Sequence, residues 1–361
     1  MNPPAFSHSY AEARQRFLDA AAARGLPVHT QVLPLPGIDG ETLALDVVLD
    51  GDPAAPALLM TTSACHGIEG FCGSAVQTGL LRQGPPGDAA VALLHVHAVN
   101  PHGFSYGRRV TQENVDLNRN FIDFGAALPD NPGYEQIHDL LLPPHWPPAP
   151  DVERALQAFR ERAGPRGWQA AVSQGQYRHA DGLYFGGLAP TWSNTAFRRV
   201  LREQVGQRRA FSWIDLHTGL GPRGVGERIF ASMDEGAALE RARAWWGAGV
   251  TSVNAGTSNS IPLSGPLQFA LADECPGIAD TNICLEFGTV PLPQMFQALR
   301  ADHWLHNHPD SDAALARRIR ADLRAAFYPD GDDWRADVWR QGLQVTEQAL
   351  AGLRRLAVHC C

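Results

Sequence analysis

The sequence contains no lysine, and all 30 of its basic residues are arginine. This absence excludes chemistry that needs a lysine amine: Schiff bases with pyridoxal phosphate, the phosphate-loop lysine, the kinase strand lysine and serine–lysine nucleophiles. Any cationic side chain in an active site must therefore be an arginine, which stays charged at all working pH values and contacts carboxylates through a planar fork.

Other signals are also missing. No apolar run approaches the ~18 residues of a membrane span, and the net charge of −8 comes without a basic block of the kind that binds nucleic acid. We therefore expect neither a membrane nor a nucleic acid as partner. The first ten residues lack the charged and apolar regions of a signal peptide, and the six cysteines form no C-x-x-C pair. The expected compartment is the cytoplasm, with free thiols.

What is present predicts a globular α/β protein. Apolar residues make up 44% of the 361 residues and charged residues 19%. Strand-like runs alternate with helical stretches, which favours a mixed, mostly parallel central sheet flanked by helices. The expected strands are two within 28–50, then 57–60, 91–99, 211–216 and 281–285; the expected helices are 11–25, 70–82, 151–163, 194–207, 236–247 and 291–305.

We expect residues 1–310 to form one catalytic domain, with a proline-rich surface excursion at 125–150. Residues 311–361 are predicted to be a helical C-terminal extension that packs on the same domain or forms an oligomer contact. In sheets of this kind, sites form at the carboxyl ends of strands. Polar residues follow the predicted strands at these ends.

The clearest local pattern is His66-Gly67-Ile68-Glu69, which follows one strand and opens a helix. An imidazole nitrogen and a carboxylate oxygen at this spacing can converge on one cation, and both are good zinc ligands. On its own the pattern is common by chance, and a helix-capping glutamate beside an ordinary histidine is the alternative.

Two further strands end in residues of the same chemical kind. One ends in Asp215-Leu216-His217, with both polar side chains on one strand face, where the carboxylate can ligate a metal or orient another ligand's imidazole. The other ends in Glu286. A carboxylate that closes a buried strand is costly unless it is paired or faces a cleft, and in zinc hydrolases it acts as the general base. Capping and ion-paired roles are the alternatives for both strand ends.

Two arginine-bearing segments lie between these elements: Arg108-Arg109, and Asn118-Arg119 within a run that begins at Asp116. One arginine fork suits a substrate carboxylate, and a separate arginine suits an oxyanion. A loop of surface arginines is the alternative.

In this order, the elements H-x-x-E, N-P-x-G-F, R-x8-N-R, D-L-H-T-G and L-E-F-G-T resemble the zinc carboxypeptidase superfamily, which includes aspartoacylase and succinylglutamate desuccinylase. The sequence is most similar to an uncharacterised bacterial branch, and the resemblance spans residues 40–305. It implies a zinc carboxypeptidase-like fold and one zinc ion held by His66, Glu69 and His217.

The resemblance also implies an activity. The protein would be a zinc metallohydrolase of the metallocarboxypeptidase type, a protease-like enzyme that cleaves an amide bond next to a free carboxylate. Glu286 would activate a zinc-bound water, Arg109 would polarise the scissile carbonyl, and Asn118 and Arg119 would hold the carboxylate. Arg108 is the alternative to Arg109, because spacing alone does not separate two neighbours.

Two departures from the family pattern leave alternatives open. The carboxypeptidases carry a mobile tyrosine between the last ligand and the base, but no tyrosine lies between His217 and Glu286. Tyr177 is our candidate substitute for substrate binding, with Tyr184 as the other. The tail is helical where aspartoacylase-type enzymes carry a β-rich domain. An N-acyl amino acid deacylase and a non-catalytic carboxylate-binding descendant are therefore the alternative functions.

Two other histidine groups are interpreted as structural. His95 and His97 lie in the middle of an apolar strand and are expected to be hydrogen-bonded core residues. A second group follows the last helix of the catalytic region and consists of His303, His306 and His308. No nearby Glu or Cys completes a ligand set with them. Residues 257–267 are expected to line the substrate pocket.

Overall fold

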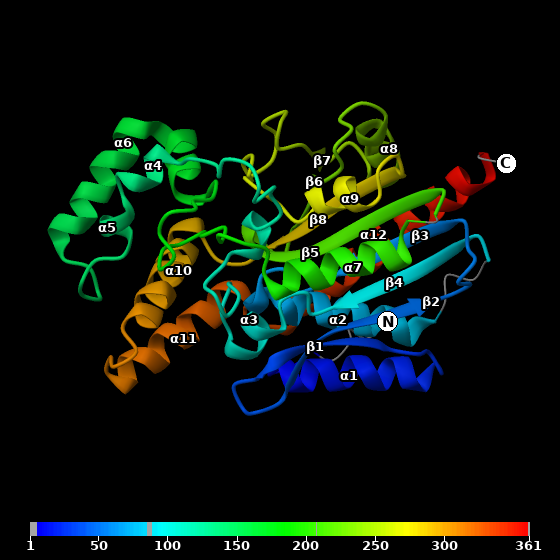
Figure 1. Ribbon diagram of the computed structural model, residues 1–361, viewed down its shortest axis with the longest axis horizontal. Coiled ribbons are helices and arrows are strands. Elements are labelled where there is room, and N and C mark those ends of the chain that lie inside the picture. The colour runs from blue at the N-terminus through cyan, green and yellow to red at the C-terminus, as the bar shows by residue number, and fades with distance from the viewer. Residues whose placement is uncertain (1–5, 85–88, 207, 360–361) are drawn as a thin grey trace.

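The structure is a computed structural model, and it describes residues 6–84, 89–206 and 208–359 (Figure 1). Its centre is an eight-stranded sheet in the order β1-β2-β4-β3-β5-β8-β6-β7. Neighbours from β4 through β3 and β5 to β8 are parallel, whereas β1, β2 and β6 bring antiparallel pairs. The predicted mixed, mostly parallel sheet is confirmed. The strands are β1 (His29–Pro36), β2 (Thr42–Asp50), β3 (Ala57–Thr62), β4 (Val91–His97), β5 (Ala210–Arg223), β6 (Gly226–Phe230), β7 (Val250–Thr251) and β8 (Ala279–Gly288).

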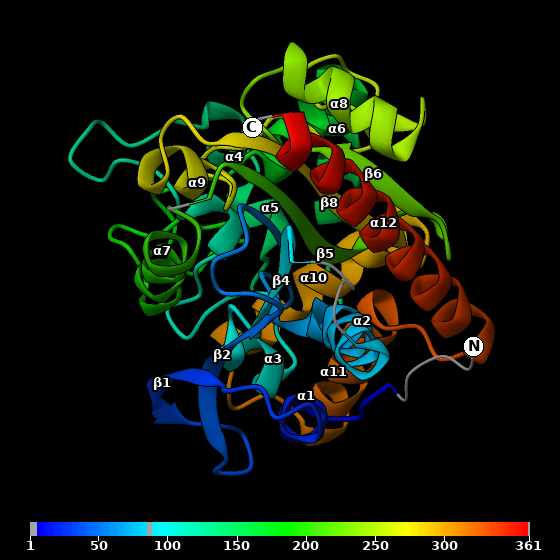
Figure 2. The same ribbon diagram turned by 90° about the vertical axis from the view of Figure 1, so that its right-hand side faces the viewer.

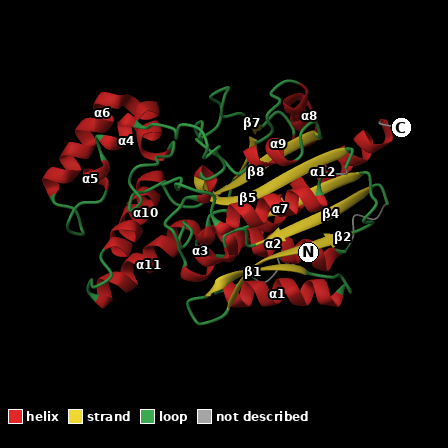
Figure 3. Cartoon of the chain, in the orientation of Figure 1, coloured by secondary structure: helices red, strands yellow, loops and turns green. Residues whose placement is uncertain are grey.

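The central strands are apolar on both faces because helices cover both sides of the sheet (Figures 2 and 3). Alternate residues of β3 enter different layers: Leu58 and Met60 join one core, and Ala57 and Leu59 join the other. The first core includes residues of α7 (Trp192–Gln204) and α9 (Phe269–Glu274); the second includes residues of α2 (Gly70–Gln83), α8 (Ala237–Trp246) and α12 (Asp332–His359).

The other helices lie around this centre, and α4, α5 and α6 extend beyond one end of the sheet (Figure 1). The sequence predicts a helix over 151–163; the structure continues it to Ser173 past a kink at Gly164, where φ is 70°. The remaining elements are α1 (Tyr10–Ala23), η1 (Gly67–Glu69), α3 (Pro101–Tyr106), η2 (Leu117–Arg119), α4 (Pro132–Glu135), α5 (His138–Leu141), α6 (Pro150–Ser173), α10 (Leu292–Asn307) and α11 (Ala313–Phe327).

The C-terminal helices share the core of the sheet. Trp334, Val338 and Val345 of α12 are fully buried in the same cluster as the core residues of α2 and β5. The division of the chain at residue 310 stays a prediction. In the part of the chain that the structure describes, no helix combines the length and the apolar character needed to cross a bilayer.

Candidate active site

His66 and Glu69 are positioned by the exit from β3. The chain leaves the strand, and His66 caps the single-turn helix η1, which ends at Glu69 and runs directly into α2. A Cβ on Gly67 would lie 2.0 Å from the carbonyl carbon of Gly103, so only glycine lets η1 approach α3 this closely. The backbone N–H of Gly67 donates to the carbonyl of Arg109, which brings the arginine segment beside the two candidate ligands.

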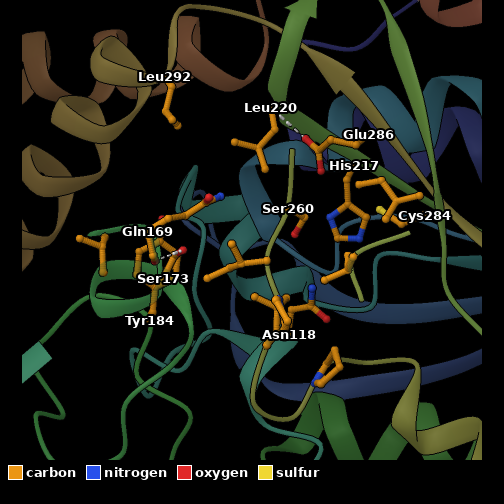
Figure 4. A pocket seen from close by; sticks show the side chains of 18 of the residues that line it. Asn118, Gln169, Ser173, Tyr184, His217, Leu220, Ser260, Cys284, Glu286 and Leu292 are labelled. Carbon is orange, nitrogen blue, oxygen red and sulfur yellow. Dashed lines mark hydrogen bonds between the residues drawn. The ribbon is translucent and has the colours of Figure 1, made fainter. Parts of the chain in front are cut away.

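His217 and Glu286 are positioned by strand pairing. In the parallel ladder between β5 and β8, His217 stands directly opposite Glu286. Neighbouring residues in register project from the same face of a sheet, so an imidazole and a carboxylate lie side by side at its edge. Figure 4 shows this pair on one wall of the site, with Leu220 above Glu286.

The three predicted metal ligands meet. Donor atoms of His66, Glu69 and His217 all lie within 4.8 Å of one another, and all three side chains are buried. Nδ1 of His217 is 3.1 Å from Oε2 of Glu69, and its Nε2 is 2.7 Å from the carboxylate of Asp215. The structure thus brings together the three segments that carry these residues, the exit of β3, η1 and β5, as predicted.

Arg109 lies against these same ligands. Its guanidinium donates to Oε1 of Glu69 at 2.9 Å, to Nε2 of His66 at 2.7 Å and to the carboxylate of Asp116 at 3.0 Å. A positive group therefore already contacts two of the three ligands, which shows that their donor atoms attract a cation. Nδ1 of His66 is buried and has no hydrogen-bond partner among the described residues, so it can ligate. Two imidazoles and one carboxylate are a typical catalytic zinc set, and the residues present fit that ion.

The electrostatics of the site separate its two histidines. Burial, together with the neighbouring Arg109, lowers the pKa of His66 well below its usual range. Burial also disfavours a charged His217, but the carboxylates of Asp215 and Glu69 outweigh it and raise the pKa of His217 well above the usual range. Burial alone would raise the pKa of Asp116, yet Arg109 and His66 hold it far below its ordinary value. The site thus consists of buried side chains of opposite charge that contact one another.

Glu286 has a raised pKa. Burial and the nearby charge of Glu69 raise the pKa of Glu286 to about 8, while His217 acts in the opposite direction. One oxygen of the carboxylate accepts a hydrogen bond from the backbone N–H of Leu220 at 3.0 Å, which fixes its orientation. A carboxylate that can hold or release a proton near neutral pH is suited to general acid–base work.

A cavity of about 620 Å³ opens onto these residues. On one wall lie His217, Cys284 and Glu286; across it lie Ser173 and Tyr184 (Figure 4). Part of the 257–267 segment lines the cavity, as predicted, through Ser260, Ile261, Pro262, Leu263 and Pro266. The apolar part of the lining comes largely from α6 and α10: Leu156, Trp168, Val172, Leu292, Met295 and Phe296.

The predicted carboxylate-binding residues also reach this cavity. Asn118 and Arg119 both line it. The guanidinium of Arg119 donates to the carbonyls of Ser173 and Asn118, and these bonds use three of its five N–H groups. Oδ1 of Asn118 accepts from the backbone N–H of Leu267, which leaves its amide nitrogen as a donor.

The two tyrosines differ in position. Tyr177 does not line the cavity; its hydroxyl donates to the carbonyl of Arg119 at 2.6 Å, so it supports the arginine from behind. Tyr184 lines the cavity, and the guanidinium carbons of Arg109 and Arg119 lie 5.5 and 5.3 Å from its ring centroid. Its φ of 54° is unusual for a non-glycine residue. The structure therefore favours Tyr184 over Tyr177 as the tyrosine that faces a substrate.

Arg108 points elsewhere. Its guanidinium donates to Asp302 of α10 at 3.0 Å and to the side chain of Asn114 at 3.2 Å, and it does not line the cavity. Of the two neighbouring arginines, Arg109 is the one that faces the ligands, and Arg108 joins two segments of the fold.

The structure also shows residues that the sequence analysis did not single out. Asp116 lies between His66 and Arg109, 3.5 Å from the first and 3.0 Å from the second. The feature of the sequence that could have indicated it is its position two residues before Asn118. Cys284 lines the cavity, with its sulfur close to donor atoms of His217 and Glu286. It lies two residues before Glu286 on the same strand, and alternation along β8 predicts this shared face.

Comparison with known proteins places the chain in a family. The model of the family described as "Protein of unknown function (DUF2817)" matches residues 6–341. The chain belongs to this family. No curated protein matches it.

Several solved structures resemble the chain. They include carboxypeptidase A from Helicoverpa armigera (12% identity, 90% of this chain and 75% of that one, TM-score 0.46). Bovine thrombin-activatable fibrinolysis inhibitor matches at 11% identity over 93% and 98% of the two chains, with a TM-score of 0.41. A succinylglutamate desuccinylase from a Silicibacter species matches at 13% identity over 83% and 65%, with a TM-score of 0.40.

Proposed function

We propose that the protein is a zinc-dependent hydrolase that cleaves an amide bond next to a free carboxylate, in a peptide or an N-acyl amino acid. The observation that carries the proposal is the meeting of His66, Glu69 and His217 at one edge of the sheet, directly beside Glu286 and inside a large cavity. Burying this many ionisable groups is costly unless function or pairing requires them, and perturbed groups in a cleft are typical of active sites.

His66, Glu69 and His217 would hold the ion. When bound, zinc supplies Lewis-acid polarisation of a carbonyl and lowers the pKa of a water molecule. Asp215 accepts a hydrogen bond from the ring of His217 and so fixes the orientation of this ligand. His66 differs: its Nε2 is 2.7 Å from the guanidinium of Arg109, which Asp116 holds in turn.

Glu286 is the proton carrier in this proposal. Its carboxylate takes a proton from the attacking water and later gives it to the leaving amine, the two roles that a group with a pKa near neutrality can fill in one cycle. The bond from Leu220 holds one oxygen in place, and the buried position excludes bulk water.

The arginines and Asn118 would recognise the substrate. Arg119 retains two N–H groups after its bonds to backbone carbonyls, and the amide nitrogen of Asn118 adds a further donor. Together they suit a terminal carboxylate, which prefers paired charged donors. Arg109 contacts the ligands directly and is assigned to the oxyanion that develops at the scissile carbonyl.

The test is hydrolysis by the full chain on a panel of peptides and N-acyl amino acids, each supplied with a free and with an amidated carboxylate. We expect turnover of free-acid substrates only, loss of turnover with a chelator, and recovery when zinc is restored. Glu286→Gln should lower kcat by about 10² to 10⁴-fold, the usual contribution of a general base, with zinc content unchanged.

Glu227→Gln is the matched control, because Glu227 stands opposite Glu286 in the β6–β8 ladder but does not line the cavity. It should retain activity. Full activity in Glu286→Gln, or equal turnover of amidated and free substrates, contradicts the proposal. Carboxylate binding without any turnover would instead support the non-catalytic alternative.

A further inference from the structure

A second group of histidines and carboxylates lies outside the cavity, where α4 and α5 meet the loop that follows α6. Donor atoms of His138, His179 and Asp181 all lie within 4.8 Å of one another. We propose that this group, together with Glu135, is a separate binding site for a transition-metal ion of the zinc class. The proposal does not depend on the function assigned to the cavity.

The geometry brings four donors from three segments together. The rings of His138 and His179 are stacked, with centroids 3.8 Å apart and planes inclined by 22°. Nε2 of His179 lies 3.2 Å from each carboxylate oxygen of Glu135, and Nε2 of His138 lies 3.8 Å from Oδ1 of Asp181. Imidazole and carboxylate donors together suit ions such as zinc and nickel, whereas calcium and magnesium prefer sites made of oxygen donors.

One donor atom in the group is left without a partner. Nδ1 of His138 is buried and has no hydrogen bond among the described residues. A buried polar atom without a partner costs free energy, and a ligand at this position would remove that cost.

The contacts also resemble those of the candidate ligands in the cavity. His179 lies against Glu135 at 3.2 Å, as His217 lies against Glu69 at 3.1 Å. The histidines at the end of α10 differ. His303 lies inside this helix, not after it as expected, and His308 is its C-cap; each contacts a backbone carbonyl one turn earlier in the helix. The group at α4 and α5 therefore has the contacts of a ligand set and not those of helix-end histidines.

A bound ion would connect the excursion to a loop that reaches the cavity. Glu135 and His138 belong to the excursion between η2 and α6, whereas His179 and Asp181 belong to the loop that carries Tyr184 into the cavity. Ligation would hold this loop against the excursion and so fix the backbone beside Tyr184. The ion is expected to stabilise the fold and not to touch a substrate.

The test is the zinc stoichiometry of the metal-stripped, full-length protein, measured by calorimetric titration and by elemental analysis after gel filtration. We expect His179→Ala to bind one equivalent less than the parent protein. We expect Asp181→Asn to weaken binding of the same equivalent by about 10-fold or more, because the loss of a ligand should cost at least as much as the loss of a group that only orients one. Asp181 is 64% exposed, so this variant should fold even if His179→Ala does not.

His145→Ala is the control, because His145 is an exposed histidine of the same excursion. It should keep the parent stoichiometry. In a His66→Ala background, zinc should still raise Tm, and adding His179→Ala should abolish that rise. Unchanged stoichiometry and affinity in both His179→Ala and Asp181→Asn would overturn the proposal, whatever the cavity binds.

Discussion

Two pairs of buried histidines lie in or beside the same sheet and have different surroundings. His66 follows β3 and His217 lies within β5, and the centroids of their rings are 5.1 Å apart. His95 lies in β4, His97 is the last residue of this strand, and both are fully buried. The first pair contacts carboxylates and an arginine, whereas the second pair, among the described residues, is hydrogen-bonded to the hydroxyls of Thr61 and Ser74, at 2.9 Å, and packs against the ring of Phe17.

The comparison shows that burial alone does not make a histidine a ligand candidate. Burial lowers the pKa of His95 to about 3 and that of His97 to about 4, so both stay neutral and form part of the core. His217 is also buried, but the carboxylates of Asp215 and Glu69 reverse the effect of burial on its pKa. What distinguishes His66 and His217, the edge pair, is direct contact with charged side chains: Arg109 for His66, and Asp215 and Glu69 for His217.

The largest expected effect on hydrolysis and zinc content comes from replacing one histidine in each pair. His217→Gln should remove the equivalent of zinc bound in the cavity and abolish hydrolysis, because it removes one of the three ligands there. His97→Gln should keep zinc content and turnover at 25 °C, since Ser74 is its only hydrogen-bond partner among the described residues. Elemental analysis and the hydrolysis assay check both. Loss of an equivalent of zinc in His97→Gln, or the full parent stoichiometry in His217→Gln, would contradict the distinction between the pairs.

The next effect concerns the cation at the edge pair. Arg109→Met should lower kcat by about 10² to 10³-fold if it stabilises the oxyanion. The same change should raise affinity for zinc, because it removes a positive group that contacts Glu69 and His66. Titration with zinc and steady-state kinetics separate the two effects. Weaker zinc binding in Arg109→Met would show that the arginine holds the ligands in place instead of competing for them.

A pH effect on stability is expected from the core pair. The unfolded chain binds a proton on His97 below pH about 6.5, whereas the folded chain does so only below about 4. The contribution of neutral His97 to stability is therefore fully present above pH 6.5 and is lost as the pH falls. At pH 5 this loss lowers the free energy of unfolding by about 2 kcal/mol. Urea unfolding at pH 7 and pH 5 should show this loss reduced by that amount in His97→Gln.

His29→Gln, at an exposed position of β1, is the control for the pH experiment and should keep the parent slope. The same slope in His97→Gln and in the parent protein would refute the assignment of acid sensitivity to this residue.

The smallest effect on activity is expected for Arg108→Gln. It breaks a mostly buried ion pair with Asp302, so it should lower the free energy of unfolding by about 1 to 3 kcal/mol. Turnover should stay within a few-fold of the parent value, in contrast to Arg109→Met. A kcat loss as large as that of Arg109→Met would return Arg108 to the candidate active site.

Much of the site could be predicted from the sequence because its residues follow strongly apolar runs. His66 follows β3, and His217 and Glu286 come directly after the apolar runs of β5 and β8, although β5 continues to Arg223, beyond the predicted end at residue 216. The direct pairing of His217 with Glu286 could not be predicted, because these residues are 69 positions apart and the register depends on how the two strands pack against the helices.

The choice between Arg108 and Arg109 was also beyond the sequence. It is decided by Asp302, a partner 194 residues away on α10. The short strands β6 and β7 were missed because their patterns are too brief to show periodicity. His138 and His179 were missed because no regular spacing links them; only folding brings them together.

The central claim is that His66, Glu69 and His217 bind one zinc ion. The most direct test is a crystal structure of the zinc-loaded protein with anomalous diffraction measured on both sides of the zinc absorption edge. We predict an anomalous peak about 2.0 to 2.2 Å from a donor atom of each of the three side chains. A zinc-loaded crystal with no peak within bonding distance of all three would contradict the account.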